Sequence, residues 1–150
     1  ADNDEYDWSC WNEVENAIEK QYDAIFVSTY RWPEIDIAQA FHQATFLPAV
    51  IYKTSNIDNC VMGNMAFNIS NLFPHMALFA KLVNENKKYF TLTKGIVNIG
   101  KNESNNNTRG YDKEKNLHPL MKTMNWTTGY ANTLHMISNK KKRKYIMILQ

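Results

Sequence analysis

The feature that most constrains the fold is a predicted β-hairpin over residues 75–99. Its arms, "HMALFAKLV" and "KYFTLTKGIVNI", flank the polar turn "NENK". A lysine prefers water, so Lys81 fixes the outer face of the first arm. The alternation of a strand then turns four side chains toward the interior, Met76, Leu78, Ala80 and Leu82. We therefore expect an antiparallel hairpin inside a larger sheet.

Other short runs of β-branched and aromatic residues predict further strands. These runs are residues 25–30, 47–54, 60–70, 130–138 and 144–150, the last two joined by the basic turn "NKKKR". Residues 7–23 instead place apolar side chains every three or four positions after the cap candidates Asp7 and Ser9, which predicts a helix. Residues 34–46 are compatible with a short helix or a structured loop.

One N-terminal α-helix and six or seven strands with short connections predict a mainly β fold. Alternating βαβ units are absent, which argues against a parallel nucleotide-binding sheet. An antiparallel meander, closed as a barrel or folded as a sandwich, fits best. A length of 150 residues with 44% hydrophobic side chains suits a single domain over residues 1–150.

Charge is distributed unevenly along the chain. Residues 1–36 hold ten acidic and two basic side chains, and residues 37–150 hold five acidic and fifteen basic ones. The two parts attract one another, or one of them attracts a partner. The run "KKKRK" at residues 140–144 is compatible with a nucleic-acid or heparin patch, but a solvated basic turn is commoner. Its flanks lack the aromatic platform that single strands need, so we expect no nucleic-acid partner.

Several features together favour a secreted, extracellular glycoprotein. No apolar stretch approaches the length of about 18 residues that a membrane span needs. The chain starts at Ala1, as a mature protein does after signal removal and as a trimmed chain also does. Cys10 and Cys60 permit one disulfide, and as thiols they would be small apolar side chains. Four N-glycosylation sequons occur where chance gives about two: Asn68, Asn102, Asn106 and Asn125.

No local signature of catalysis is present. The chain lacks G-x-S-x-G, H-E-x-x-H, C-x-x-C and a glycine-rich phosphate loop, so we predict no enzyme, cofactor or metal site. The histidines are scattered at His42, His75, His118 and His135, which neither supports nor excludes a site assembled in space. An enzyme built from distant groups such as Asp36, His42 and His135 is the weakest alternative.

One cluster of acidic and aromatic residues stands out after the first predicted strand. Glu34 and Asp36 lie beside Tyr30 and Trp32. A carboxylate with aromatic faces holds a cation such as a biogenic amine well. An exposed acidic loop is the commoner interpretation of such a segment.

The sequon at Asn68 lies inside the predicted strand 60–70. A glycosylated Asn68 must face water, and strand alternation then turns the opposite set inward, namely Val61, Gly63, Met65, Phe67 and Ile69. A packed core and a ligand cavity are the two possible environments for that set. The pattern alone leaves both open, with a filled core the commoner outcome.

The order of these segments resembles the salivary lipocalins of ticks. A Trp-bearing helix is followed by "YDAIFVSTYRW", a long connection, "CVMGNMAFNIS" and a hairpin through "FTLTKGIVNI". Trp11, Thr29-Tyr30 and Cys60-Val61 carry the resemblance, which spans roughly residues 8–100. The later cysteines of that family are absent here, so we expect Cys60 to bond Cys10 instead.

The resemblance implies an eight-stranded lipocalin-like β-barrel that is secreted into saliva. Such a protein sequesters a biogenic amine or a lipid mediator in an apolar cup, without chemistry on the ligand. The side chains that we expect to contact the ligand are Phe26, Tyr30, Trp32, Glu34, Asp36, Met65, Phe67 and Leu78. The alternative is a secreted β domain with a filled core that contacts another protein, such as a host protein, through the basic turn and the acidic helix.

Overall fold

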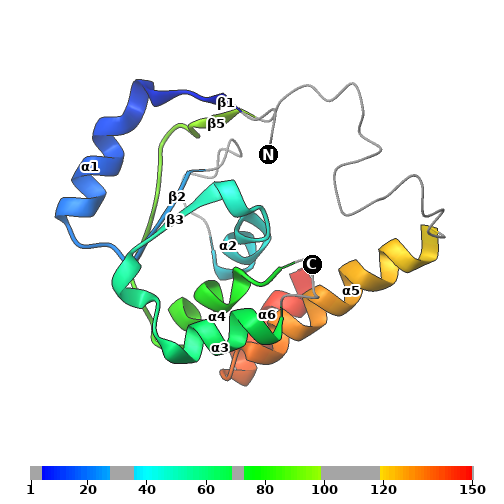
Figure 1. The fold of residues 1–150 in the computed structure, drawn as a ribbon. Helices are drawn as coiled ribbons and strands as arrows, with labels where there is room; N and C mark the ends of the chain where they lie inside the picture. The colour runs from blue at the N-terminus through cyan, green and yellow to red at the C-terminus, as the bar shows by residue number, and fades with distance from the viewer. Residues whose placement is uncertain (1–4, 28–35, 69–72, 99–118, 150) are drawn as a thin grey trace.

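The computed structural model describes residues 5–27, 36–68, 73–98 and 119–149, with side chains of the last range from residue 127 onward (Figure 1). The described residues are mainly helical. The first half contains β1 (Glu5–Tyr6), the 3-10 turn η1 (Trp8–Cys10), α1 (Trp11–Glu19), β2 (Ala24–Phe26), α2 (Ile37–Ala44), η2 (Leu47–Ala49), β3 (Val50–Tyr52) and η3 (Thr54–Asn56). The second half contains α3 (Asn59–Phe67), α4 (Met76–Asn84), β4 (Tyr89–Thr91), β5 (Val97–Asn98), α5 (Pro119–Met136) and α6 (Lys140–Leu149).

The strands form small open sheets, so the predicted barrel is wrong. β2 lies in the centre of a three-stranded sheet of order β3-β2-β4, antiparallel to β3 and parallel to β4. β1 and β5 form a separate antiparallel pair. Because the strands have two or three residues and are flanked by helices, this is an α/β fold. The predicted antiparallel meander, the predicted sandwich and the alternative of a β domain are therefore wrong as well.

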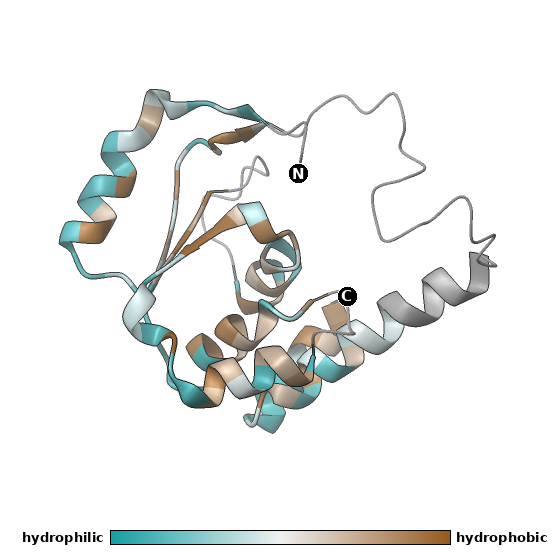
Figure 2. Ribbon diagram, viewed as in Figure 1, coloured by the Kyte–Doolittle hydropathy of each residue, from teal (hydrophilic) through white to brown (hydrophobic). Residues whose placement is uncertain are grey.

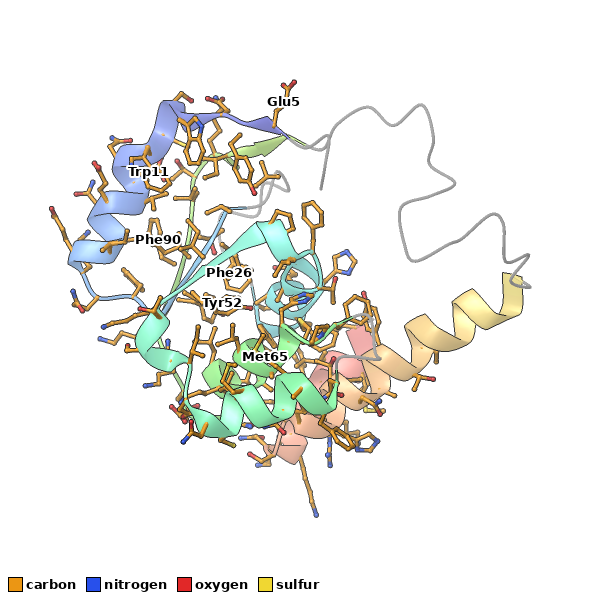
Figure 3. All side chains as sticks on the ribbon, viewed as in Figure 1. Glu5, Trp11, Phe26, Tyr52, Met65 and Phe90 are labelled. Carbon is orange, nitrogen blue, oxygen red and sulfur yellow. The ribbon has the colours of Figure 1, made fainter. Side chains whose placement is uncertain are left out.

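The central strand is buried on both faces, which sets the layering of the molecule. Ile25 and Val27 pack into a cluster beneath α1 that includes Val14. Phe26 points the other way, into a larger cluster with Phe41 of α2. Figure 1 shows α1 on one side of the sheet and α2 with α4 on the other, and Figure 3 places Trp11 and Phe90 on the α1 side. Adjacent residues of β2 thus serve two hydrophobic cores.

The predicted N-terminal helix is confirmed as η1 and α1. The side chain of Asp7 caps η1 by accepting a hydrogen bond from the Ser9 amide at 2.9 Å. Val14 and Ala17 are buried against the sheet, while the acidic Glu15 faces solvent. Glu13 accepts a hydrogen bond from the Thr93 amide at 3.0 Å, which fastens α1 to the segment after β4.

Within the two strands predicted at residues 60–70 and 75–83, residues 60–67 and 76–83 are helical instead. Asp58 caps α3, since its Oδ1 accepts the Val61 amide at 2.9 Å. α4 is rich in Met, Ala, Leu and Lys, which are strong helix formers, and it is buried nearly all round. Seven of its nine residues are buried, and a short, nearly continuous apolar run does not distinguish a buried helix from a buried strand. Lys81, assigned to an outer strand face, forms an ion pair with Asp58 that joins α4 to α3.

The predicted C-terminal hairpin is also helical. The segment "NKKKR" is the start of α6, where Asn139 Oδ1 accepts the amides of Lys141 and Lys142 at 3.1 and 3.0 Å. Lys142 Nζ then donates to the Val83 carbonyl at 3.2 Å and to Asn86 Oδ1 at 2.6 Å, at the end of α4. These contacts select a helix over the strand that the β-branched and aromatic residues of 144–150 indicated.

Hydropathy follows the layers of the fold. Figure 2 shows apolar residues on the sheet and α4 and hydrophilic residues on the outside of α1. Among the described helices, none is long and apolar enough to cross a bilayer.

Core and surface phenylalanines give a direct test of this fold. Phe26 is 1% exposed and Phe67 is 81% exposed. We predict that Phe26→Ala lowers the free energy of unfolding by about 3–5 kcal/mol because it leaves a core cavity. Phe67→Ala is expected to change it by less than about 0.5 kcal/mol. Urea denaturation measures both, and a large loss from Phe67→Ala would contradict the helical assignment of residues 59–67.

Candidate functional site

A pocket of about 650 Å³ lies where α2, α5 and α6 meet. This volume is in the range of about 300–1,000 Å³ that small-molecule sites occupy. Its described lining combines polar and apolar side chains from α2 and from the consecutive C-terminal helices α5 and α6. The lining residues are Asp36, Ala38, Gln39, His42 and Gln43 at α2, Tyr130 of α5 and Leu149 of α6.

The polar side of the pocket is a stripe along α2. Asp36, Gln39 and Gln43 recur at intervals of three and four residues, which puts them on one face of the helix. Asp36 is the N-cap, and its Oδ1 accepts the amides of Ala38 and Gln39, both at 2.9 Å. The Gln39 side chain completes a capping box by accepting the Asp36 amide at 3.1 Å. The cap fixes the position of the carboxylate at the pocket.

Asp36 also joins α6 to this site. The hydroxyl of Tyr145 donates to Asp36 Oδ2 at 2.9 Å across 109 residues of sequence. The Gln39 amide, together with the Tyr145 hydroxyl and the Ala38 amide, holds the pKa of the Asp36 carboxyl below its usual value. The group is therefore an anion at neutral pH.

Gln43 is buried at the pocket without a protein partner. The residue is 4% exposed, and within the described part of the chain neither Nε2 nor Oε1 of its amide has a hydrogen-bond partner. Asn56 shows the usual situation, since its buried amide donates to the carbonyl and carboxylate of Asp23 at 3.3 Å. A buried amide left unpaired costs about 1–3 kcal/mol, so Gln43 is a candidate for binding a ligand.

The described histidines do not gather at the pocket. His42 is exposed and lines it, whereas His135 is exposed on α5. His75 is buried, its Nε2 donates to the Ala44 carbonyl at 3.0 Å, and burial lowers the pKa of the imidazole. His118 lies outside the described residues. Among the residues that the structure describes, no three His, Cys, Asp or Glu side chains form a group that could hold a metal ion.

The side chains predicted to contact a ligand are distributed over separate parts of the molecule. Asp36 lines the pocket. Phe26 is in the core, edge-on to Tyr89 with ring centroids 5.5 Å apart. Met65 of α3 packs against the cluster that contains Leu78, and Figure 3 shows it at the helical end of the molecule.

The last predicted contact among the described residues does not line the pocket either. Phe67 faces solvent at the end of α3. Tyr30, Trp32 and Glu34 lie outside the described residues. Asp36 is therefore the single predicted contact that the described residues place at the pocket.

The predicted disulfide is wrong, because both cysteines are free thiols. Cys10 is buried beneath α1, where its Sγ donates to the Lys94 carbonyl at 3.4 Å and burial raises the pKa of the thiol. Cys60 is exposed in the first turn of α3. The two residues belong to different layers of the fold, which Figure 1 shows well apart.

The sequon at Asn68 does not lie in the strand that the sequence predicted. Asn68 is buried at the C-cap of α3, and its Nδ2 donates to the Asn64 carbonyl at 2.8 Å. The strand-face argument that put Asn68 in water is therefore wrong, because the segment is a helix. Asn125 belongs to α5 in a part without described side chains, and Asn102 and Asn106 lie outside the described residues. Glycosylation stays a prediction at these sites.

Sequence reasoning missed most of the pocket. Gln39 was identifiable, because "DIAQ" is a D-x-x-Q capping box. Gln43 was identifiable as the next polar position of the same stripe. Tyr130, Tyr145 and Leu149 reach the site only through the packing of α5 and α6, which residue spacing does not encode.

Comparison with known proteins adds no assignment: no family model, curated protein or solved structure matches the chain. The resemblance to tick lipocalins stays untested as a relationship, and the barrel that it implied is absent from the described structure.

The unpaired amide of Gln43 makes a specific prediction about stability. Gln43→Met keeps an unbranched side chain of similar length and removes the unpaired polar atoms. We expect it to raise the free energy of unfolding by about 1–2 kcal/mol. Asn56→Leu, which removes a paired buried amide, is expected to lower it by about 1–3 kcal/mol. Urea denaturation of both variants checks the contrast, and a destabilised Gln43→Met protein would show that the amide is paired.

The Asp36 cap makes a prediction about pH. Since folding lowers the pKa of this carboxyl, its stabilisation is present above the unfolded value and is lost as pH falls through the folded value. Asn caps helices about as well as Asp but carries no charge. The stability advantage of the wild type over Asp36→Asn should therefore shrink below the ordinary pKa of 3.8. Denaturation from pH 7 to pH 3 measures it, and a difference independent of pH would contradict the interpretation.

Proposed function

We propose that the pocket between α2, α5 and α6 binds a small amphipathic molecule that carries an amine. The observation that carries the proposal is Gln43, a pocket-lining amide that is almost fully buried and unpaired in the described part of the protein. An unpaired buried amide reduces stability. Both polar atoms of Gln43 are enclosed in the unliganded protein, so we propose that the side chain turns toward the pocket when a ligand binds, and the hydrogen bond then recovers that free energy. Stability alone favours an apolar side chain at this position, whereas binding favours the amide.

The charge of the lining supports a cationic group on the ligand. Taking histidine as neutral, the carboxylate of Asp36 is the one charged side chain among the described lining residues. A carboxylate has roughly four acceptor positions. Two N–H groups bind Oδ1 and one hydroxyl binds Oδ2, so Oδ2 retains a position for an ammonium group.

The apolar lining supports an aromatic or aliphatic body on the same ligand. Ala38 and Leu149 supply aliphatic surface, and Tyr130 supplies a ring that favours both stacking and a nearby cation. An arylalkylamine combines these features. Our proposal thus keeps the amine ligand that the acidic and aromatic residues near Asp36 predicted. It places the ligand in a pocket between helices, where the sequence predicted the interior of a barrel.

The activity that we propose is sequestration, with no chemistry on the ligand. Secretion, expected from the sequons, would put such a protein in contact with amine mediators outside the cell.

Binding of matched probes tests the proposal. Isothermal titration calorimetry with tryptamine and its neutral counterpart tryptophol separates the contribution of the charge from that of the ring. We expect tryptamine to bind more tightly, and Asp36→Asn to weaken it by about 10- to 100-fold, since a charge-assisted hydrogen bond contributes about 1.5–3 kcal/mol. Gln43→Met should weaken both probes while the protein becomes more stable.

Asp58→Asn is the matched control, because Asp58 is the N-cap of α3 and does not line the pocket. This variant should bind tryptamine as the wild type does. Equal affinities for tryptamine and tryptophol, or an Asp36→Asn protein with unchanged tryptamine affinity, would rule out the amine. A Gln43→Met protein that binds both probes normally would rule out the pocket itself.

A further inference from the structure

The outward face of α6 combines lysines with exposed aliphatic side chains. A period of 3.6 residues puts five side chains on the side opposite the buried Ile146: Lys140, Lys141, Lys144, Met147 and Ile148. All five are exposed, and Met147 and Ile148 retain 60% and 69% of their accessible surface. We call this set the outward face of α6.

The lysines of this face have no structural role in the described part of the protein. Lys142, on the inward side, donates to the Val83 carbonyl and so fastens α6 to α4. Lys140, Lys141 and Lys144 form no ion pair with any described residue. Moreover, the positive end of the helix dipole is at the N-terminus of α6, where cations reduce helix stability. Folding therefore gains nothing from these three charges.

The aliphatic residues continue the same face toward the end of the helix. Met147 and Ile148 follow Lys144 by three and four residues, so the three side chains are neighbours on the surface. Lysines attract phosphate groups. Transfer of the neighbouring aliphatic side chains from water into the bilayer is favourable in free energy. A helix face with both is typical of contact with the surface of an anionic bilayer.

A nucleic acid matches this face less well than a lipid surface does. Phosphates of a nucleic acid would pair with the lysines, but they would leave Met147 and Ile148 in water. Bases stack on aromatic side chains, and none is present among the five residues of this face.

We propose that the outward face of α6 binds the surface of membranes that contain anionic phospholipids. The three lysines contact the head groups, and Met147 and Ile148 enter the boundary between head groups and acyl chains. Tyr145 and Leu149 stay directed toward α2, where they contact Asp36 and line the pocket.

Vesicle flotation tests the proposal with the full chain. Vesicles of phosphatidylcholine with about 30 mol% phosphatidylserine should carry the protein upward, and pure phosphatidylcholine should not. The triple variant Lys140→Gln, Lys141→Gln, Lys144→Gln should bind about 100-fold more weakly, because each lysine contributes about fivefold. Binding of the wild type should also fall as salt is raised.

A second triple variant controls for net charge. Lys20→Gln, Lys53→Gln, Lys88→Gln removes the same charge from exposed positions outside α6. It should weaken vesicle binding by less than about threefold, because long-range attraction is screened by salt. Equal losses in the two triple variants would show that net charge, and not the outward face, attracts the vesicles, which would overturn the proposal.

The aliphatic contribution is tested by Met147→Ser, Ile148→Ser. This variant should bind anionic vesicles at least about tenfold more weakly, because two apolar side chains no longer enter the bilayer. Circular dichroism verifies that each variant is folded. Unchanged affinity in this variant, or binding of a single-stranded oligonucleotide without binding of vesicles, would overturn the proposal. Tryptamine binding is measured separately, so a failed pocket and a failed membrane contact are distinguishable.

Discussion

Burial of β2 on both faces is the constraint on which the rest of the fold depends. Ile25 and Val27 face one cluster, and Ala24 and Phe26 face the other. Two apolar faces require two covering layers, because each exposed face would lose the free energy of burial. α1 supplies one layer, and α2, α4 and α6 contribute to the other. The short strand thus organises the helices around it and positions α2 beside α6.

Sequence patterns predicted the N-terminal helix and the two strands that follow it. α1 has buried apolar residues on one side and acids on the other, with Asp7 as a cap, and its helix was predicted correctly. β2 and β3 were predicted from their β-branched and aromatic residues. α3 was missed because it has apolar residues on every side and shows no helical period, and α4 was missed because seven of its nine residues are buried and its nearly continuous apolar run is also typical of a buried strand.

The C-terminal helices were missed for a different physical reason. Residues 144–150 carry side chains of high β propensity, yet tertiary contacts decide their conformation. Asn139 caps α6, Lys142 donates to the end of α4, and Ile146 enters the main core. Each contact depends on a segment more than fifty residues away or on a cap inside a basic run. The tertiary contacts of α6 therefore outweigh the β propensity of residues 144–150.

The candidate site shows the same division between local and tertiary information. Asp36 was selected from the sequence because a carboxylate beside aromatic residues suits an amine, and it does line the pocket. Its cap and the stripe to Gln43 are local features of α2. Tyr130, Leu149 and the Tyr145 hydrogen bond come from the packing of α5 and α6. One helix thus supplies a wall of the pocket with its inward side and a cationic surface with its outward side.

The central claim is that the amide of Gln43 contacts a ligand in the pocket. The most direct measurement is the side-chain amide resonance of Gln43 in a ¹⁵N correlation spectrum, assigned by its loss in Gln43→Met and followed during titration with tryptamine. The account predicts that both amide protons of Gln43 shift with the same saturation curve as the backbone amides of α2. A Gln43 resonance that stays in place while tryptamine saturates the protein would contradict the account.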